Sequence, residues 1–124
     1  MPRILVVEDN EGNRDVLTRQ LQHQGYDVVT AFDGKQAVEM ARSESPDLVL
    51  MDLNLPDIDG WEAARQIRGS PEISRLPIIA ISAHARSDDE EQAITAGCNK
   101  FHTKPVDFSR LLDQIESLLK SCAE

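Results

Sequence analysis

The chain alternates short apolar runs with segments of helical periodicity, and this alternation restricts its fold more than any other feature. Because parallel strands need long crossover connections, alternating strands and helices predict an α/β domain with a parallel sheet and helices on both faces. The expected strands cover residues 4–7, 26–31, 48–51, 77–81 and a short stretch around Phe101. The expected helices cover residues 11–24, 36–42, 61–67, 87–97 and the segment that follows Asp107.

Local signals mark the ends of several of these helices. Gly25 is placed to end the first helix, and Gly97 to end the fourth, which begins with a capping box from Ser87 to Glu90. Asp107 is placed to cap the last helix. That helix shows the clearest amphipathic pattern of the chain, formed by Phe108, Leu111, Leu112, Ile115, Leu118 and Leu119.

Length and charge restrict the function classes. The 124 residues fit one domain, and we expect residues 1–124 to form it without an output domain. A net charge of -9 opposes binding to nucleic acid or to an anionic membrane surface. No apolar run approaches the roughly 18 residues of a membrane span. Cys98 and Cys122 form neither a metal motif nor a disulfide framework, so we expect a cytoplasmic protein.

Polar residues stand where the expected strands end. Residues 48–51 read as a strand buried on both faces, and Asp52 follows directly, although a buried carboxylate is costly without a partner. Glu8 and Asp9 follow the first strand, and Ser82 the fourth. Because parallel strands place their carboxyl ends at one edge, where ligands of open α/β sheets bind, we expect a site there.

Electrostatics indicates what this site binds. Two carboxylates about 4 Å apart repel by roughly 4 kcal/mol at an effective dielectric near 20, so three converging carboxylates imply a cation. Carboxylate ligands with room for water and phosphate favour Mg²⁺, and Mn²⁺ can substitute. With Lys104 adding positive charge and Ser82 a hydroxyl donor, the pocket suits a phosphoryl group, and Asp52 is the candidate nucleophile.

The spaced motifs resemble those of response-regulator receiver domains, the phosphoacceptor modules of two-component signalling, over essentially the whole chain. The matching segments are ILVVEDN, DLVLMDLNLPDIDG, IIAISAHA and FHTKP. The resemblance implies a (βα)5 doubly wound, flavodoxin-like fold with a five-stranded parallel sheet in the order 2-1-3-4-5.

The resemblance also implies a phosphoacceptor and a metal site. Asp52 would accept the phosphoryl group, while Asp9, Asp52 and the backbone carbonyl of Asn54 would contact the metal directly. Glu8, which stands where aspartate is commoner in the family, would act largely through bound water.

Further roles follow from the same resemblance. Lys104 would pair with the phosphoryl oxygens, aimed by a cis peptide before Pro105. Ser82 and Phe101 would form the switch pair, and Phe101 lacks the hydroxyl of the equally familiar tyrosine. Asn54 and His84 would tune dephosphorylation.

Single residues have simpler interpretations. Taken alone, Asp52 would be a strand-end cap, Lys104 a surface lysine and Ser82 a strand-ending hydroxyl, and only their combination favours the functional site. Phe101 is also expected in the core, and His84 in an exposed loop. Trp61 is expected to pack at the start of the third helix, and Cys98 to fill space. His102 stands where the family usually has an aliphatic residue.

Three other function classes share part of this pattern. A magnesium-dependent aspartyl phosphatase of the haloacid dehalogenase type needs a second aspartate two residues after the nucleophile, where this chain has Asn54. A flavodoxin-like flavin carrier needs a phosphate loop after the first strand, where Glu8 and Asp9 would repel phosphate. A phosphorylation-independent binding module with the receiver fold stays open.

The expected mechanism is a phosphorylation-driven switch. A histidine kinase or histidine phosphotransfer protein would donate to Asp52, and the domain would catalyse only this transfer and its own slow hydrolysis. We expect the donor to contact the first helix near Asn13, Val16 and Arg19, and the corner at Pro105. Output would pass to a downstream protein, or into a phosphorylation-dependent homodimer, through the face made by the fourth helix, fifth strand and last helix.

Overall fold

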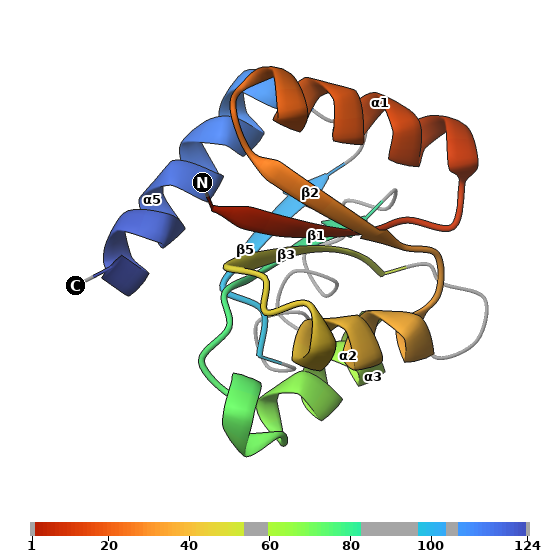
Figure 1. Ribbon diagram of the computed structural model, residues 1–124, viewed down its shortest axis with the longest axis vertical. Helices are drawn as coiled ribbons and strands as arrows, with labels where there is room; N and C mark the ends of the chain where they lie inside the picture. The colour runs from red at the N-terminus through yellow and green to blue at the C-terminus, as the bar shows by residue number, and fades with distance from the viewer. Residues whose placement is uncertain (1, 54–59, 83–96, 104–106, 124) are drawn as a thin grey trace.

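A five-stranded parallel sheet forms the centre of the protein in a computed structural model that describes residues 2–53, 60–82, 97–103 and 107–123 (Figure 1). The described strands are β1 (Arg3–Val7), β2 (Asp27–Ala31), β3 (Leu48–Asp52), β4 (Ile78–Ser82) and β5 (Lys100–Thr103). The described helices are α1 (Glu11–His23), α2 (Gly34–Ser43), α3 (Gly60–Arg68), α5 (Phe108–Ala123) and a 3₁₀ turn, η1 (Pro71–Ile73).

The strands pair in the order β2-β1-β3-β4-β5, as expected. β1 pairs in parallel with both β2 and β3, so the chain runs outward to β2 and returns past β1 to reach β3. Open α/β sheets bind ligands at such a reversal point, outside the carboxyl ends of the strands. The topology therefore places the ends of β1 and β3 side by side where a site is expected.

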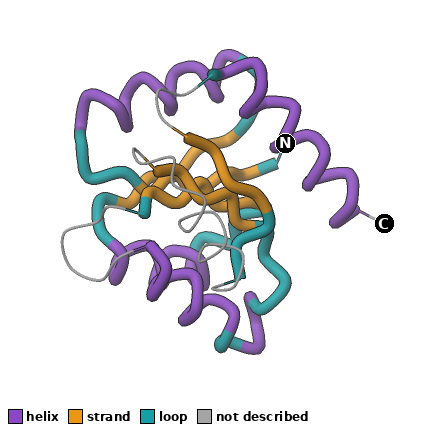
Figure 2. The backbone as a smooth tube through the Cα atoms, turned by 180° about the vertical axis from the view of Figure 1, so that it is seen from behind, coloured by secondary structure: helices purple, strands orange, loops and turns teal. Residues whose placement is uncertain are grey.

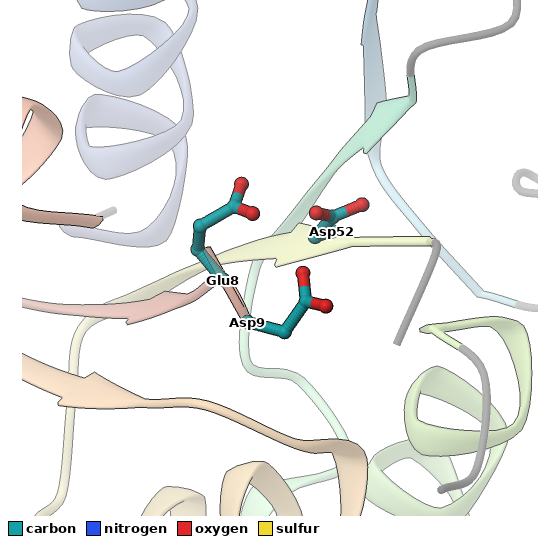
Figure 3. A group of neighbouring side chains, drawn as sticks. All are labelled: Glu8, Asp9 and Asp52. Atoms are coloured by element: carbon teal, nitrogen blue, oxygen red, sulfur yellow. The ribbon is translucent and has the colours of Figure 1, made fainter. Parts of the chain in front are cut away.

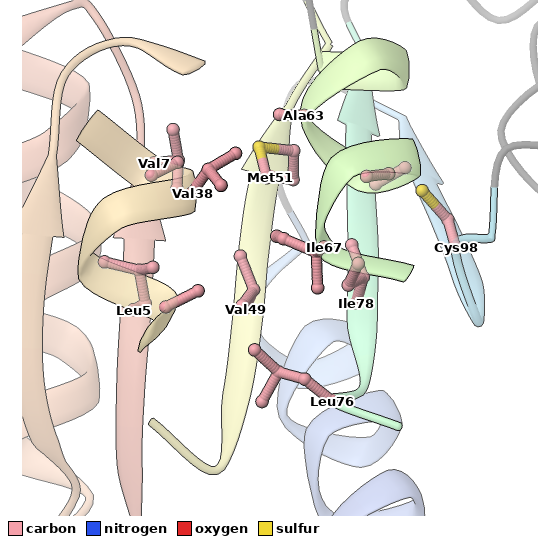
Figure 4. Packing of buried hydrophobic residues seen from close by; sticks show 14 of the residues in the cluster. Leu5, Val7, Val38, Val49, Met51, Ala63, Ile67, Leu76, Ile78 and Cys98 are labelled. Carbon is pink, nitrogen blue, oxygen red and sulfur yellow. The ribbon is translucent and has the colours of Figure 1, made fainter. Parts of the chain in front are cut away.

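Helices cover both faces of the sheet, with α1 and α5 on one face and α2 and α3 on the other (Figures 1 and 2). Successive residues of a strand point to opposite faces, so each central strand supplies both cores. The core under α2 and α3 contains Leu5, Val7, Val49, Met51, Ile78, Ile67 and Cys98 (Figure 4). The core under α1 and α5 contains Ile4, Val6, Leu48, Leu50, Ile79, Leu17, Leu21, Leu111 and Ile115.

The burial predictions are confirmed. All five residues of β3 are buried, as the continuous apolar run indicated. Trp61 packs beside the α2/α3 core, and Cys98 is buried in it. The periodic apolar residues of α5 all join the other core, which accounts for the strength of that pattern.

Short polar side chains begin the helices. The Asn10 side chain accepts the Asn13 N–H at 3.0 Å to cap α1, and Asp107 accepts the Arg110 N–H at 3.3 Å at the start of α5. Gly25 follows α1 with φ +91°, a conformation that favours glycine, and so ends the helix as predicted.

Some predicted bounds were wrong by one or two residues. Helix α2 begins at Gly34 rather than at residue 36, because the Asp33 side chain accepts the Gln36 N–H at 2.7 Å and caps it. β4 runs one residue further than expected and includes Ser82. The η1 turn was not predicted, and the helix expected between Ser87 and Gly97 lies outside the described residues. Among the described helices, none combines the length and apolar character needed to span a membrane.

Candidate functional site

Three carboxylates meet at the carboxyl ends of β1 and β3. Glu8 and Asp9 follow β1 directly, and Asp52 is the last residue of β3. Each residue offers a carboxylate oxygen, and these three oxygens all lie within 4.8 Å of one another (Figure 3). The structure therefore brings together the three acidic residues that the strand ends indicated.

The turn from β1 into α1 holds Glu8 in place. Its backbone N–H donates to the Ala31 carbonyl of β2 at 3.1 Å, and its own carbonyl accepts Arg14 Nη1 at 2.9 Å. The Asn10 N–H donates to Glu8 Oε1 at 3.2 Å, while the Asn10 side chain caps α1. Glu8 is buried with 3% exposure, whereas the next residue, Asp9, faces solvent.

Asp52 and Ser82 end adjacent strands. Asp52 pairs in register with Ile81, and the next N–H, that of Leu53, donates to the Ile81 carbonyl at 2.9 Å. Ser82 is the residue after Ile81 and ends β4. Asp52 is 2% exposed and Ser82 is 3% exposed. A buried carboxylate and a buried hydroxyl thus lie at the same edge of the sheet.

The donor set fits a hard divalent cation. Three carboxylates within this range repel one another strongly, and a cation among their oxygens would remove that repulsion. Oxygen ligands of which one is open to solvent, here Asp9, suit Mg²⁺, which keeps several waters. The arrangement can therefore bind a metal and present a buried carboxylate beside it.

Phe101 lies on β5, in register with Ala80 of β4. The ring is half-buried and packs against the α2/α3 core, which confirms the expected packing. The other predicted site residues, Asn54, His84, Lys104 and Pro105, lie outside the described residues.

Arg14 is a neighbour of the site that the sequence patterns did not indicate. Its guanidinium donates to the Glu8 carbonyl and also lies 5.8 Å from the centre of the Phe32 ring, in a cation–π contact. Phe32 follows β2 and is 52% exposed. The contact depends on the spatial proximity of the first turn of α1 and the turn after β2, so a local pattern could not reveal it.

Comparison with known proteins places this arrangement among signalling domains. A family model described as the response regulator receiver domain matches residues 4–116. The polar-differentiation response regulator DivK of Brucella anthropi is 34% identical over 120 residues, which cover 96% of this chain and 98% of that protein.

Two solved structures share the fold. The receiver domain of the sensor histidine kinase PA1611 from Pseudomonas aeruginosa, with a magnesium ion coordinated in its active-site cleft, is 38% identical with a TM-score of 0.89. The match covers 96% of this chain and 98% of that one. A response regulator from Chloroflexus aurantiacus is 27% identical with a TM-score of 0.92, and the match covers 97% and 99% of the two chains.

Proposed function

This chain belongs to the response regulator receiver domain family of two-component signalling, and from that premise we propose that Asp52 accepts a phosphoryl group from a phosphohistidine. The observation that carries the proposal is the carboxylate cluster of Glu8, Asp9 and Asp52 at the carboxyl ends of β1 and β3. The donor is a histidine kinase or a histidine phosphotransfer protein.

Asp52 acts as the nucleophile. One of its carboxylate oxygens forms a bond to phosphorus while the bond from phosphorus to the donor imidazole breaks, and the electron pair of that bond returns to the imidazole. The burial of Asp52 supports this role because a poorly hydrated carboxylate is more reactive than one in bulk water. The Ser82 hydroxyl donates a hydrogen bond to a phosphoryl oxygen, and Lys104 supplies positive charge.

Glu8, Asp9 and Asp52, with the Asn54 carbonyl, would hold Mg²⁺ or Mn²⁺. The bound ion would neutralise the carboxylates and the phosphoryl oxygens. The acidic cluster supports this assignment, as does the magnesium ion in the Pseudomonas receiver domain.

The donor contacts the outer face of α1. Val16 is 57% exposed on this helix, and Asn13 and Arg19 are also exposed. We expect Arg19→Glu to slow transfer from a phosphorylated donor protein and to leave transfer from phosphoramidate unchanged, because the small donor needs no docking surface. Lys120→Glu, on the exposed side of α5, is the matched control. An equal effect of the two reversals would exclude docking at α1.

The phosphoryl group changes the surface used by partners. Ser82 and Phe101 form the switch pair, and the affected face includes β5 and α5. A downstream protein or a second copy of the chain binds that face after phosphorylation. Asn54 and His84 set the rate at which water removes the phosphoryl group.

Intact mass measurement tests the central step. The protein is incubated with phosphoramidate and Mg²⁺ beside Asp52→Asn, an EDTA control, and Asp15→Asn, which removes an exposed carboxylate of α1 outside the cluster. Phosphate should add to the wild type and to Asp15→Asn and be absent from the other two samples. A folded wild-type protein that takes up no phosphate would instead be a phosphorylation-independent binding module.

A further inference from the structure

A histidine lies in the core beside the edge strand of the sheet. His102 of β5 is 1% exposed, although most buried positions of the described strands carry apolar side chains. β5 pairs with β4 on one side and is the last strand in the sheet order, so its other edge has no strand partner among the described residues. The Gln114 side chain of α5 forms a hydrogen bond with the backbone of β5.

Hydrogen bonds identify the tautomer of the His102 imidazole. The Asp107 N–H, which can only donate, lies 3.2 Å from His102 Nε2. Nε2 is therefore the unprotonated acceptor, and in a neutral ring Nδ1 carries the proton. Nδ1 lies 3.0 Å from Gln114 Oε1 and donates to it. A charged imidazolium would carry a proton on Nε2 as well and would lose the Asp107 N–H as a partner.

The Gln114 side chain contacts β5 at two points. Its Nε2 donates to the Phe101 carbonyl at 3.4 Å, and its Oε1 accepts from His102. Both ring nitrogens of His102 and both polar atoms of the Gln114 amide therefore have a partner, which favours one arrangement of this buried polar network. Gln114 precedes Ile115, a fully buried residue of α5, so the core packing of the helix determines where its amide lies.

The His102 imidazole connects β5 both to the residue that caps α5 and to the second turn of that helix. Asp107 directly precedes the helix and caps it, and Gln114 lies two turns further along. His102 contacts both, while Gln114 also holds the backbone of Phe101. A movement of β5 at Phe101 cannot keep these bonds unless the first two turns of α5 move with it.

We propose that His102 and Gln114 are positioning residues that transmit a displacement of β5 to helix α5. The proposal rests on the phosphorylation of Asp52 proposed above, and it assigns to this chain the contact by which that event reaches α5. Neither residue touches the phosphoryl group. If the pair had only a structural role, it would stabilise α5 equally with and without phosphate on Asp52. If the pair transmits the displacement, the stability of α5 depends on whether Asp52 is phosphorylated.

The first measurement is the ¹⁵N NMR spectrum of the histidine side chains in the wild-type protein, assigned by the loss of one set of signals in His102→Leu. The expected result is a neutral ring protonated at Nδ1. A ring protonated at Nε2 would overturn the network and the proposal with it.

The second measurement is amide hydrogen exchange of residues 108–115 with and without phosphoramidate and Mg²⁺, beside intact mass to confirm phosphate uptake. The wild type should show at least a threefold change in exchange rate between the two states. In Gln114→Met the change should fall below 1.5-fold, roughly the level of no coupling, while phosphate uptake is retained. Asp113→Asn, a change of an exposed neighbour on the same helix, is the control and should behave as wild type.

Gln114→Glu separates the two contacts and serves as the second variant if Gln114→Met fails to fold. A glutamate can accept from His102 Nδ1 but cannot donate to the Phe101 carbonyl, so transmission should be lost although the histidine contact is kept. A wild-type response in either folded variant would overturn the proposal. Absence of phosphate on the wild type would instead overturn the proposed function, and the mass measurement distinguishes the two failures.

Discussion

Glu8 and Asp52 lie at the carboxyl ends of adjacent parallel strands, and carboxylate oxygens of these two nearly inaccessible side chains lie within 4.8 Å of each other. The repulsion between these two charges arises only in the folded state, so it lowers the stability of the protein, and a divalent cation between them would remove it. The site is therefore expected to reduce the stability of the protein in the absence of divalent ions.

Glu8→Gln should raise the free energy of unfolding in EDTA by about 1–2 kcal/mol, since it removes one of the repelling charges and keeps the oxygen that accepts the Asn10 N–H. Mg²⁺ at ten times its dissociation constant should stabilise the wild type by about 1.4 kcal/mol and Glu8→Gln by less. Urea denaturation measures both effects. Glu39→Gln, on the exposed side of α2, is the control, and equal stabilities for all three proteins in EDTA would contradict the prediction.

Arg68 joins the end of α3 to the segments that precede β4 and β5. Its guanidinium donates to the carbonyls of Leu76 at 2.5 Å, Gly97 at 2.8 Å and Ser74 at 3.1 Å, and to Asn99 Oδ1 at 2.8 Å. Arg68→Met keeps the apolar stem and leaves these acceptors without the donor. We expect a loss of about 3 kcal/mol in the free energy of unfolding, because hydrogen bonds to charged groups are the stronger ones.

Arg65→Met is the control for this substitution on the same helix. Arg65 is exposed and pairs only with the neighbouring Glu62 at 3.2 Å among the described ion pairs, so its loss should cost less than about 0.5 kcal/mol. Chemical denaturation of the two variants measures the difference. Similar losses would show that the contacts of Arg68 add nothing to the stability.

Gly97→Ala should be more destabilising than Gly25→Ala. Both glycines have positive φ, +110° and +91°, so both substitutions strain the backbone by about 1–2 kcal/mol. A Cβ at Gly25 would meet nothing within 4 Å, whereas a Cβ at Gly97 would lie 2.5 Å from Arg68 Cγ. The extra cost at Gly97 should be roughly 1–3 kcal/mol, as for other overpacked sites.

A double-mutant cycle with Arg68→Met tests the origin of that extra cost. If the clash with the arginine stem causes it, the cost of Gly97→Ala should fall in the Arg68→Met background, because the methionine side chain has lost the hydrogen bonds that hold it there. Additive costs would show that the backbone alone is responsible.

Burial raises the pKa of the Cys98 thiol to about 11, and the nearby Arg68 charge only partly opposes this. Because the folded state keeps its proton more tightly than the unfolded state, the resulting stability is fully present below the ordinary thiol pKa and is lost as the pH rises toward about 11. The loss between about pH 9 and pH 11 should be roughly 2 kcal/mol.

Stability measured from pH 8 to pH 11 in a Cys122→Ser background should therefore fall more steeply with Cys98 present than after Cys98→Ala. Parallel curves for the two proteins would refute the prediction. The alanine variant also loses apolar contacts, but that loss does not depend on pH and shifts the whole curve.

Sequence patterns determined the five strands and the four described α-helices, the two-sided burial of β3 and the polar strand ends. These features depend on local chemistry: a short continuous apolar run such as 48–51, which a polar residue follows directly, favours a strand buried on both faces wherever it lies in the fold. Strand ends are local as well, so Glu8, Asp9, Asp52 and Ser82 could be assigned to one edge once the sheet was known to be parallel. The family resemblance then supplied their expected roles.

Tertiary structure decided which polar groups meet across elements. The donors of Arg68, the contact of Arg14 with Phe32, and the bonds from His102 to Asp107 and Gln114 join residues that no local pattern relates. Their partners are backbone or side-chain groups left accessible by the packing of helices on the sheet. Hydrogen bonding is directional and short-ranged, so these contacts exist only when the packed chain brings donor and acceptor within about 3 Å.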